Sequence, residues 1–82
     1  MSKTKSEKVS LILDMKGEEC STIRLELRIR ILEIEKDNLI KLITDRPESV
    51  ISLPKWCNLN GHELFLSDEK DGEYIFYIKR RI

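Results

Sequence analysis

The most reactive side chains in the sequence are the thiols of its two cysteines, Cys20 and Cys57. A thiolate is a soft nucleophile, so these residues are the first candidates for chemistry. Two cysteines form at most one disulfide, and in a reducing compartment each is expected to remain a free thiol. Cys20 is read as a reactive thiol or as a small buried apolar residue. For Cys57, which follows Trp56, we predict packing. The alternative, a second, resolving thiol, needs α-carbons within about 7 Å.

His62 is the only histidine and the other candidate for acid–base or metal chemistry. Cys57 and His62 together supply two ligands, whereas a structural zinc site takes four, and no clustered carboxylates complete the set. We therefore predict no metal and no cofactor, and place His62 at the end of a helix or the start of a strand. The sequence shows no glycine-rich phosphate loop, Ser-His-Asp arrangement or catalytic carboxylate pair.

Charge and composition limit the partners. Fifteen basic and fifteen acidic residues cancel, which argues against a global field for nucleic acid or an anionic membrane. The basic run 79–81 is read as a solvated strand end.

No apolar run approaches the roughly 18 residues of a membrane span. Residues 1–8 lack an apolar stretch and predict a flexible tail rather than a signal peptide. Residues 9–82 are expected to form one domain, located in the cytoplasm.

Apolar runs and turn residues predict most of the elements. Four strands are expected over residues 9–15, 39–44, 62–67 and 73–79, the last with Tyr74 and Phe76 directed outward. Residues 67–72 are expected to form a hairpin loop, because its Asp71-Gly72 pair favours positive φ. Residues 47–61 predict a helix that opens with Pro47, is bent or interrupted by Pro54, and ends at Asn60-Gly61.

The segment 21–36 fits two structures. Its apolar residues alternate with charged ones from Ile23 to Ile31, which is typical of a strand. Its length and its Leu, Glu and Arg content favour a helix instead. Such a helix would have two apolar faces, one formed by Ile23, Leu27, Ile31 and Ile34 and the other by Leu25, Ile29 and Leu32. Exposure of the second face would be evidence of association.

An ordered set of motifs resembles the TusA (SirA-like) family of small sulfur-carrier proteins. The set comprises Leu13-Asp14 and Gly17 before Cys20, Pro47 after the run 39–45, Leu53-Pro54-Lys55-Trp56-Cys57 leading to His62-Glu63-Leu64, and Asp71-Gly72 before the aromatic strand. The resemblance implies an α+β fold, a βαβαββ two-layer sandwich whose four-stranded mixed sheet carries both helices on one face. It thereby assigns the segment 21–36 to a helix.

The same resemblance implies that Cys20 begins the first helix and carries sulfane sulfur as a persulfide. The family motif is Cys-Pro-x-Pro, whereas this chain reads Cys20-Ser21-Thr22-Ile23 and lacks both prolines. The first proline normally presets helical φ. Ser21 or Thr22 is expected to take over that role by capping.

Neighbouring residues are expected to support the thiol. Asp14 is expected to bond turn amides and Gly17 to supply a backbone angle closed to other residues. A helix N-terminus and Arg24, one turn along, would favour a Cys20 thiolate. Glu18 and Glu19 would oppose it if they point at the sulfur.

Two classes of function remain open at this point. The first is a sulfur carrier that receives sulfur from a cysteine desulfurase, a rhodanese or a DsrE-like protein and relays it to an acceptor protein, more a carrier than a turnover enzyme. The second is a catalytically inactive interaction or regulatory module that uses the face of Leu25, Ile29 and Leu32, with weak self-association. An RNA-binding module is a distant third, because no motif of that kind is present.

Overall fold

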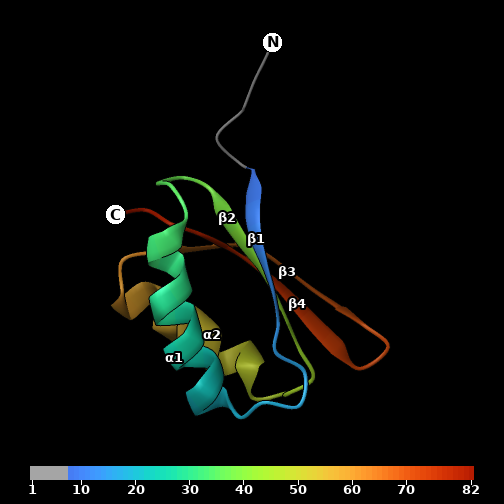
Figure 1. Ribbon diagram of the computed structural model, residues 1–82. Coiled ribbons are helices and arrows are strands. Elements are labelled where there is room, and N and C mark those ends of the chain that lie inside the picture. Colours follow the sequence, from blue (N-terminus) through green and yellow to red (C-terminus); the bar gives the residue numbers. More distant parts are fainter. Residues whose placement is uncertain (1–7) are drawn as a thin grey trace.

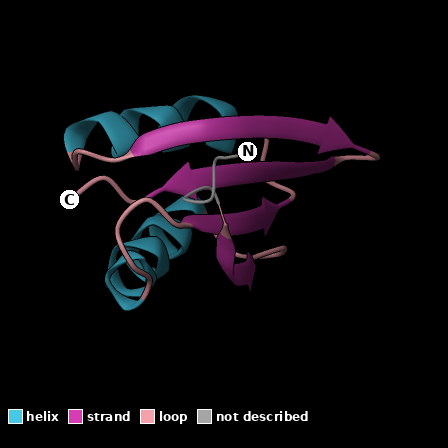
Figure 2. Ribbon diagram, turned by 90° about the horizontal axis from the view of Figure 1, so that it is seen from above, coloured by secondary structure: helices cyan, strands magenta, loops and turns pink. Residues whose placement is uncertain are grey.

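Two helices cover one face of a four-stranded sheet in the computed structural model, which describes residues 8–82 (Figures 1 and 2). The elements are β1 (Val9–Asp14), α1 (Cys20–Arg30) with its 3₁₀ extension η1 (Ile31–Glu33), β2 (Leu39–Thr44), α2 (Ser49–Leu59), β3 (Glu63–Lys70) and β4 (Glu73–Lys79). The predicted βαβαββ two-layer sandwich is confirmed. Most of the predicted tail, residues 1–7, lies outside the described residues.

The sheet has the strand order β1-β2-β4-β3. β1 runs parallel to β2, while β4 is antiparallel to both β2 and β3. A parallel pair needs a crossover connection, which α1 provides. The carboxyl ends of β1 and β2 therefore lie at the same edge of the sheet, and each leads there into a helix.

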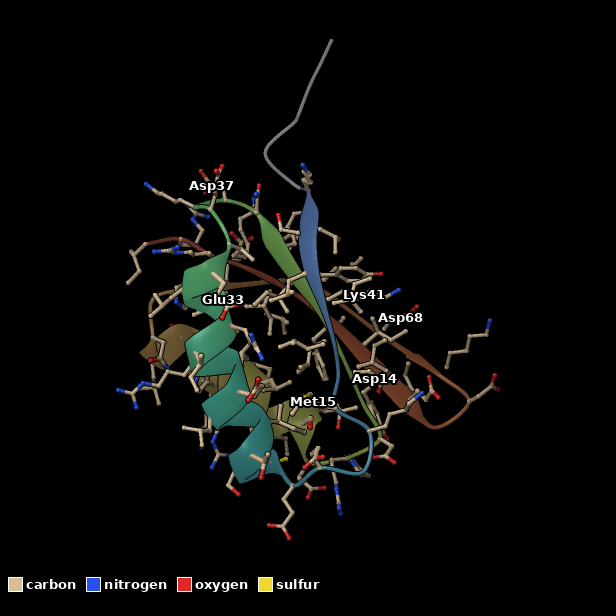
Figure 3. All side chains as sticks on the ribbon, viewed as in Figure 1. Asp14, Met15, Glu33, Asp37, Lys41 and Asp68 are labelled. Atoms are coloured by element: carbon tan, nitrogen blue, oxygen red, sulfur yellow. The ribbon has the colours of Figure 1, made fainter. Side chains whose placement is uncertain are left out.

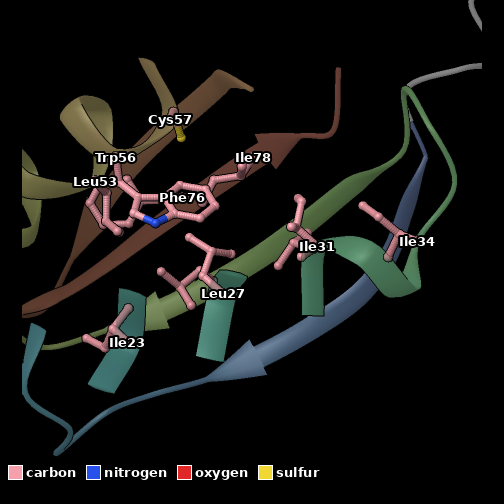
Figure 4. Packing of buried hydrophobic residues seen from close by; sticks show 11 residues of the cluster. Ile23, Leu27, Ile31, Ile34, Leu53, Trp56, Cys57, Phe76 and Ile78 are labelled. Carbon is pink, nitrogen blue, oxygen red and sulfur yellow. The ribbon is translucent and has the colours of Figure 1, made fainter. Parts of the chain in front are cut away.

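The ambiguous segment 21–36 is helical as far as Glu33, and the predicted helix is wrong for residues 34–36, where the backbone becomes extended at Ile34. The segment buries one of its two apolar faces. Ile23 and Leu27 are fully buried, and Ile31 and Ile34 continue this face along the core (Figure 4). Leu25, Ile29 and Leu32 lie on the other face and are 59%, 51% and 67% exposed. A helix is favoured because spacings of three and four residues bring one complete stripe onto the sheet. The predicted second apolar face exists and is uncovered among the described residues.

The core lies between the helices and the sheet. Leu53, Trp56 and Cys57 of α2 belong to the same cluster as Phe76 and Ile78 of β4 (Figure 4). The outward placement of Phe76 was wrong: this side chain is 2% exposed and belongs to the core, with Tyr74 packed against it. Alternation separates the two faces of a strand, but it does not say which face meets the helices when both are apolar.

The hairpin between β3 and β4 is tighter than predicted. β3 continues to Lys70, and only Asp71 (φ +53°) and Gly72 (φ +81°) form the turn. Positive φ at both positions suits the twist of a two-residue hairpin. The predicted loop is wrong for residues 67–70, whose backbone pairs with β4 so that Asp68 lies opposite Ile75. Their polar side chains are exposed, but ladder hydrogen bonds need only the backbone.

The start of α2 is two residues later than predicted, at Ser49. Pro47 and Glu48 form a turn in which Ser49 N donates to Arg46 O (3.0 Å). The other end agrees with the sequence, because Gly61 has φ +77° and His62 N donates to Cys57 O (2.9 Å), which closes the helix. The later start places Ser49 in the first turn of α2, facing the first turn of α1.

Candidate functional site

A tight turn after β1 sets the position of Cys20. Asp14 and Met15 stand where the strand ends and the chain bends toward α1 (Figure 3). Lys16 N donates to Asp14 Oδ1 (3.2 Å), the kind of turn hydrogen bond expected of Asp14. Gly17 has φ +86°, and a Cβ there would meet open space. Glycine is therefore favoured at position 17 by its positive φ and not by a lack of space for a side chain.

The loop after β2 holds this turn from the side. Asp45 Oδ1 accepts from Gly17 N (3.1 Å), and Arg46 Nε donates to Glu18 O (3.0 Å). The sequence reasoning gave neither residue a role. The signal that could have found them is the parallel pairing of β1 and β2, which brings the residues following both strands to one edge. Two loops 28 residues apart are thereby joined beside Cys20.

Cys20 is the first residue of α1, and its free thiol is half-buried. Glu19 precedes the helix with extended backbone (φ −75°, ψ 158°), and its carbonyl accepts from Ile23 N (2.9 Å). The helix thus begins at the cysteine although both prolines of the family motif are missing. A helix N-terminus presents free N–H groups and a positive dipole end, which favour an anion.

The expected capping by Ser21 does not occur. The residue in the capping position is Glu19, and no side-chain capping hydrogen bond is recorded there among the described residues. Ser21 and Thr22 already lie inside the first helical turn and are exposed. A capping side chain belongs to the residue with extended backbone that precedes the helix. Residues 21 and 22 follow that position, so their hydroxyls cannot cap α1.

Two hydroxyls of α2 meet the Cys20 sulfur. Ser49 Oγ lies 3.6 Å from Cys20 Sγ, and Ser52 Oγ donates to the same sulfur at 3.8 Å. The two serines are one helical turn apart and share a face of α2. Ser49 is fully buried, and the sulfur is the one recorded partner of its side chain in residues 8–82. Hydroxyl donors stabilise a sulfur anion by charge-assisted hydrogen bonds.

Arg24 lies on the side of α1 that faces α2. It lines a hollow together with Ser52, Trp56 and two other residues of α2. No hydrogen bond or ion pair of Arg24 is recorded within the described part of the chain. Its charge effect on the Cys20 thiol therefore remains a prediction.

Cys57 has the opposite environment. Its side chain is 2% exposed in the apolar cluster, and burial raises the pKa of the thiol to about 12 (Figure 4). A thiol with that pKa stays protonated at neutral pH and is a poor nucleophile. This environment suits the packing role predicted for Cys57 and argues against a resolving thiol.

His62 serves the end of α2. Its ring stacks on Trp56 with centroids 5.8 Å apart, and its Nδ1 accepts from Arg81 N (3.2 Å). Burial first, and the Arg80 charge second, lower the pKa of His62, which favours the neutral ring.

Residues 8–82 contain no group of three or more His, Cys, Asp or Glu able to hold a metal ion. Neither described helix has the length and apolar character to cross a bilayer.

The fold and the site define a small two-layer α/β sandwich with a half-buried free thiol at the first residue of α1. The family model described as "Sulfurtransferase TusA" matches residues 11–80, so the chain belongs to the TusA family. The match covers almost all of the described chain, including both strand–helix connections.

Curated relatives agree with this assignment. The chain is 31% identical over 70 residues to the sulfur carrier protein TusA of Pseudomonas putida (strain W619), covering 85% of this chain and 88% of that protein. It is 30% identical over 73 residues to the sulfur carrier protein TusA of Pseudomonas aeruginosa (strain LESB58), covering 89% and 92%. These matches support a sulfur-carrier role in general and partner proteins that exchange sulfur with it.

Proposed function

We propose that Cys20 accepts sulfane sulfur as a persulfide and relays it to an acceptor protein. The observation that carries the proposal is the half-buried free thiol of Cys20 at the start of α1, with the buried Ser49 hydroxyl 3.6 Å from its sulfur. A buried hydroxyl is retained in a core when it has a partner. Here that partner is the sulfur of Cys20, the less buried of the two described thiols.

The transfer needs no oxidant, reductant or cofactor. The Cys20 thiolate attacks the terminal sulfur of a donor cysteine persulfide, a new sulfur–sulfur bond forms, and the donor's own sulfur–sulfur bond breaks. The donor cysteine leaves as a thiolate, and the proton of the transferred sulfur stays with Cys20–S–SH. In the second step an acceptor thiolate attacks that terminal sulfur, and Cys20 leaves as a thiolate.

The neighbouring groups act on the sulfur in both steps. The N-terminal end of α1 and the hydroxyls of Ser49 and Ser52 stabilise Cys20 as an anion, first as the nucleophile and later as the leaving group. The turn with Asp14 and Gly17 fixes the place of the cysteine, and Asp45 and Arg46 hold the turn. These are positioning roles, because the hydrogen bonds of the Cys20 sulfur within the described residues go to Ser49 and Ser52 and not to these four residues.

The partners follow from this chemistry. The donor is a protein with a persulfide, such as a cysteine desulfurase, a rhodanese or a DsrE-like protein, and the acceptor is a protein thiol. We place the exchange in the cytoplasm, where thiols are kept reduced. The function requires no nucleic-acid contact and no membrane contact.

Intact-protein mass spectrometry tests the proposal. The reduced protein is incubated with a persulfide donor, and we expect an adduct of about 32 Da, the mass of one sulfur atom. Cys20→Ser is expected to abolish the adduct, while Cys57→Ala keeps it. An adduct that survives Cys20→Ser, or no adduct on the unsubstituted protein, overturns the proposal.

A second function is favoured by one observation, the exposed face of Leu25, Ile29 and Leu32 on α1. Such a face fits an interaction or regulatory module that does not use the thiol. That function predicts association, including weak self-association, that Leu25→Asp or Ile29→Asp weakens and Cys20→Ser leaves unchanged. Light scattering over a concentration series measures the molar mass and separates the two functions. The interaction module predicts a mass that rises with concentration through this face, whereas the carrier function requires no self-association.

A further inference from the structure

A hollow of about 250 Å³ opens between α1 and α2 beside the proposed carrier thiol. Arg24 lines it from α1, and Ser52, Lys55, Trp56 and Leu59 line it from α2. Ser52 joins the two places, since its hydroxyl also donates to Cys20 Sγ. One residue of the wall of the hollow therefore contacts the Cys20 sulfur.

The hollow combines apolar walls with two positive charges. Leu59 is 82% exposed, while Trp56 is almost buried and presents only part of its ring. The structure records no hydrogen bond or ion pair for Arg24 or for Lys55 within residues 8–82, and no acidic side chain lines the hollow. Both cations are available to a bound group.

Acidic residues stand at the starts of the two helices and do not line the hollow. Glu19 precedes α1 and Glu48 precedes α2, each directly before the first helical turn. Arg24 and Lys55 lie beyond these starts, each in the second turn of its helix. A partner segment that crosses Cys20 thus meets negative charge at the helix starts and positive charge at the hollow. This difference in charge favours one orientation of the bound segment.

We propose that this hollow binds a segment of the sulfur-exchanging partner in which an acidic and an apolar side chain lie close to the reactive cysteine. The inference rests on the proposed function of Cys20 and adds the chemistry of the partner. The carboxylate pairs with Arg24 and Lys55, and the apolar side chain covers Leu59 and the edge of Trp56. A site of this size gives a brief contact guided by charge, which suits a carrier that must release each partner.

Short peptides with an activated cysteine test this docking without a persulfide. Each peptide carries its cysteine as a mixed disulfide with thionitrobenzoate and has a leucine and one variable residue beside it. The Cys20 thiolate attacks the peptide sulfur, the new disulfide forms, and thionitrobenzoate leaves as a coloured anion. The variable residue is Asp, Asn or Lys, and the Cys57→Ala protein confines the reaction to Cys20.

The ratio of the Asp rate to the Lys rate is the measured quantity, because changes in the thiolate itself cancel in it. We expect the Asp peptide to react about three to ten times faster at low salt, with a ratio that approaches one in about 0.5 M salt. The double variant Arg24→Glu, Lys55→Glu is expected to reverse the preference. Lys70→Glu, which reverses one charge at the far end of the hairpin, is the control for a charge reversal away from the hollow and keeps the ratio, and each single variant, Arg24→Glu or Lys55→Glu, is compared with it at equal net charge.

Equal rates for the Asp and Lys peptides, or an equal response to the two kinds of charge reversal, overturn the docking proposal. If a second Cys20 thiolate attacks the peptide adduct and releases the peptide thiol, a Cys20-linked dimer forms. A dimer that replaces the adduct equally fast for all three peptides would indicate that a second copy occupies this surface, and it would also overturn the proposal. These results are separate from the persulfide test, because an unreactive persulfide donor does not alter the peptide ratio.

Discussion

Cys20 and Cys57 are the same residue type on two helices over one sheet, and their surroundings differ at every point. Cys20 begins α1, is half-buried and has two hydroxyls at its sulfur. Cys57 lies in the last turns of α2, is 2% exposed and has a pKa raised to about 12 by burial. The position within the helix, and not the residue type, separates a thiol for exchange from a thiol for packing.

The largest expected contrast is in alkylation of the folded protein. With iodoacetamide near neutral pH, we expect Cys20 to react about a hundredfold or more faster than Cys57, because the buried thiol reacts only when the core opens. Peptide mapping after timed quenching measures both rates. The same labelling in strong denaturant is the control and should bring the two rates together. Similar rates in the folded protein would contradict the comparison.

The second contrast concerns stability at high pH. Because the pKa of Cys57 is raised in the folded state, folding keeps its proton and the unfolded chain releases it first. The stability from the protonated thiol is therefore fully present below the unfolded pKa of about 8.5 and is lost as pH rises toward 12.

This loss amounts to at most about 1.4 kcal/mol per pH unit within that window. Urea unfolding between pH 8 and 10.5 measures it as the difference between the unsubstituted protein and Cys57→Ala, in which the pH-dependent fall should be smaller. Cys20→Ser, which leaves the buried thiol in place, is the matched control and is expected to keep the part of the fall that comes from Cys57. An equal pH dependence with and without Cys57 would mean that its thiol titrates alike in both states.

The smallest expected effect comes from the hydroxyls. The Ser49 hydroxyl can donate to the sulfur once Cys20 is a thiolate, so Ser49→Ala is expected to lower the alkylation rate of Cys20 about threefold. Ser52→Ala acts in the same direction, while Ser67→Ala on the exposed edge strand is the control. An unchanged rate in Ser49→Ala, with the fold intact by circular dichroism, would show that the hydroxyl packs without acting on the thiol.

The order of the motifs predicted the fold well. The family resemblance assigned residues 21–36 to a helix, although the spacing of their apolar residues fits both a strand and a helix. Local turn chemistry also predicted well: Gly17, Gly61 and the Asp71-Gly72 pair all have the positive φ expected or allowed by their type. The length of β3 was missed because residues 67–70 are polar, and an edge strand is held by its backbone alone.

The site itself was predicted in part. Cys20, Asp14 and Gly17 are close in sequence and could be joined by one turn. Ser49, Ser52, Asp45 and Arg46 come to the same place only through the parallel pairing of β1 and β2, and no local pattern marks them. The predicted capping role of Ser21 was wrong because a cap belongs to the single residue before the helix. That residue is Glu19, since the helix already begins at Cys20.

The most direct test of the carrier chemistry is to locate the sulfur on the unsubstituted protein. After reaction with a persulfide donor, alkylation traps the terminal sulfur, and peptide mapping compares the fragments that contain Cys20 and Cys57. We expect the added sulfur on Cys20 alone, with Cys57 recovered as an unmodified thiol. Sulfur on Cys57, or on neither residue, would contradict the account.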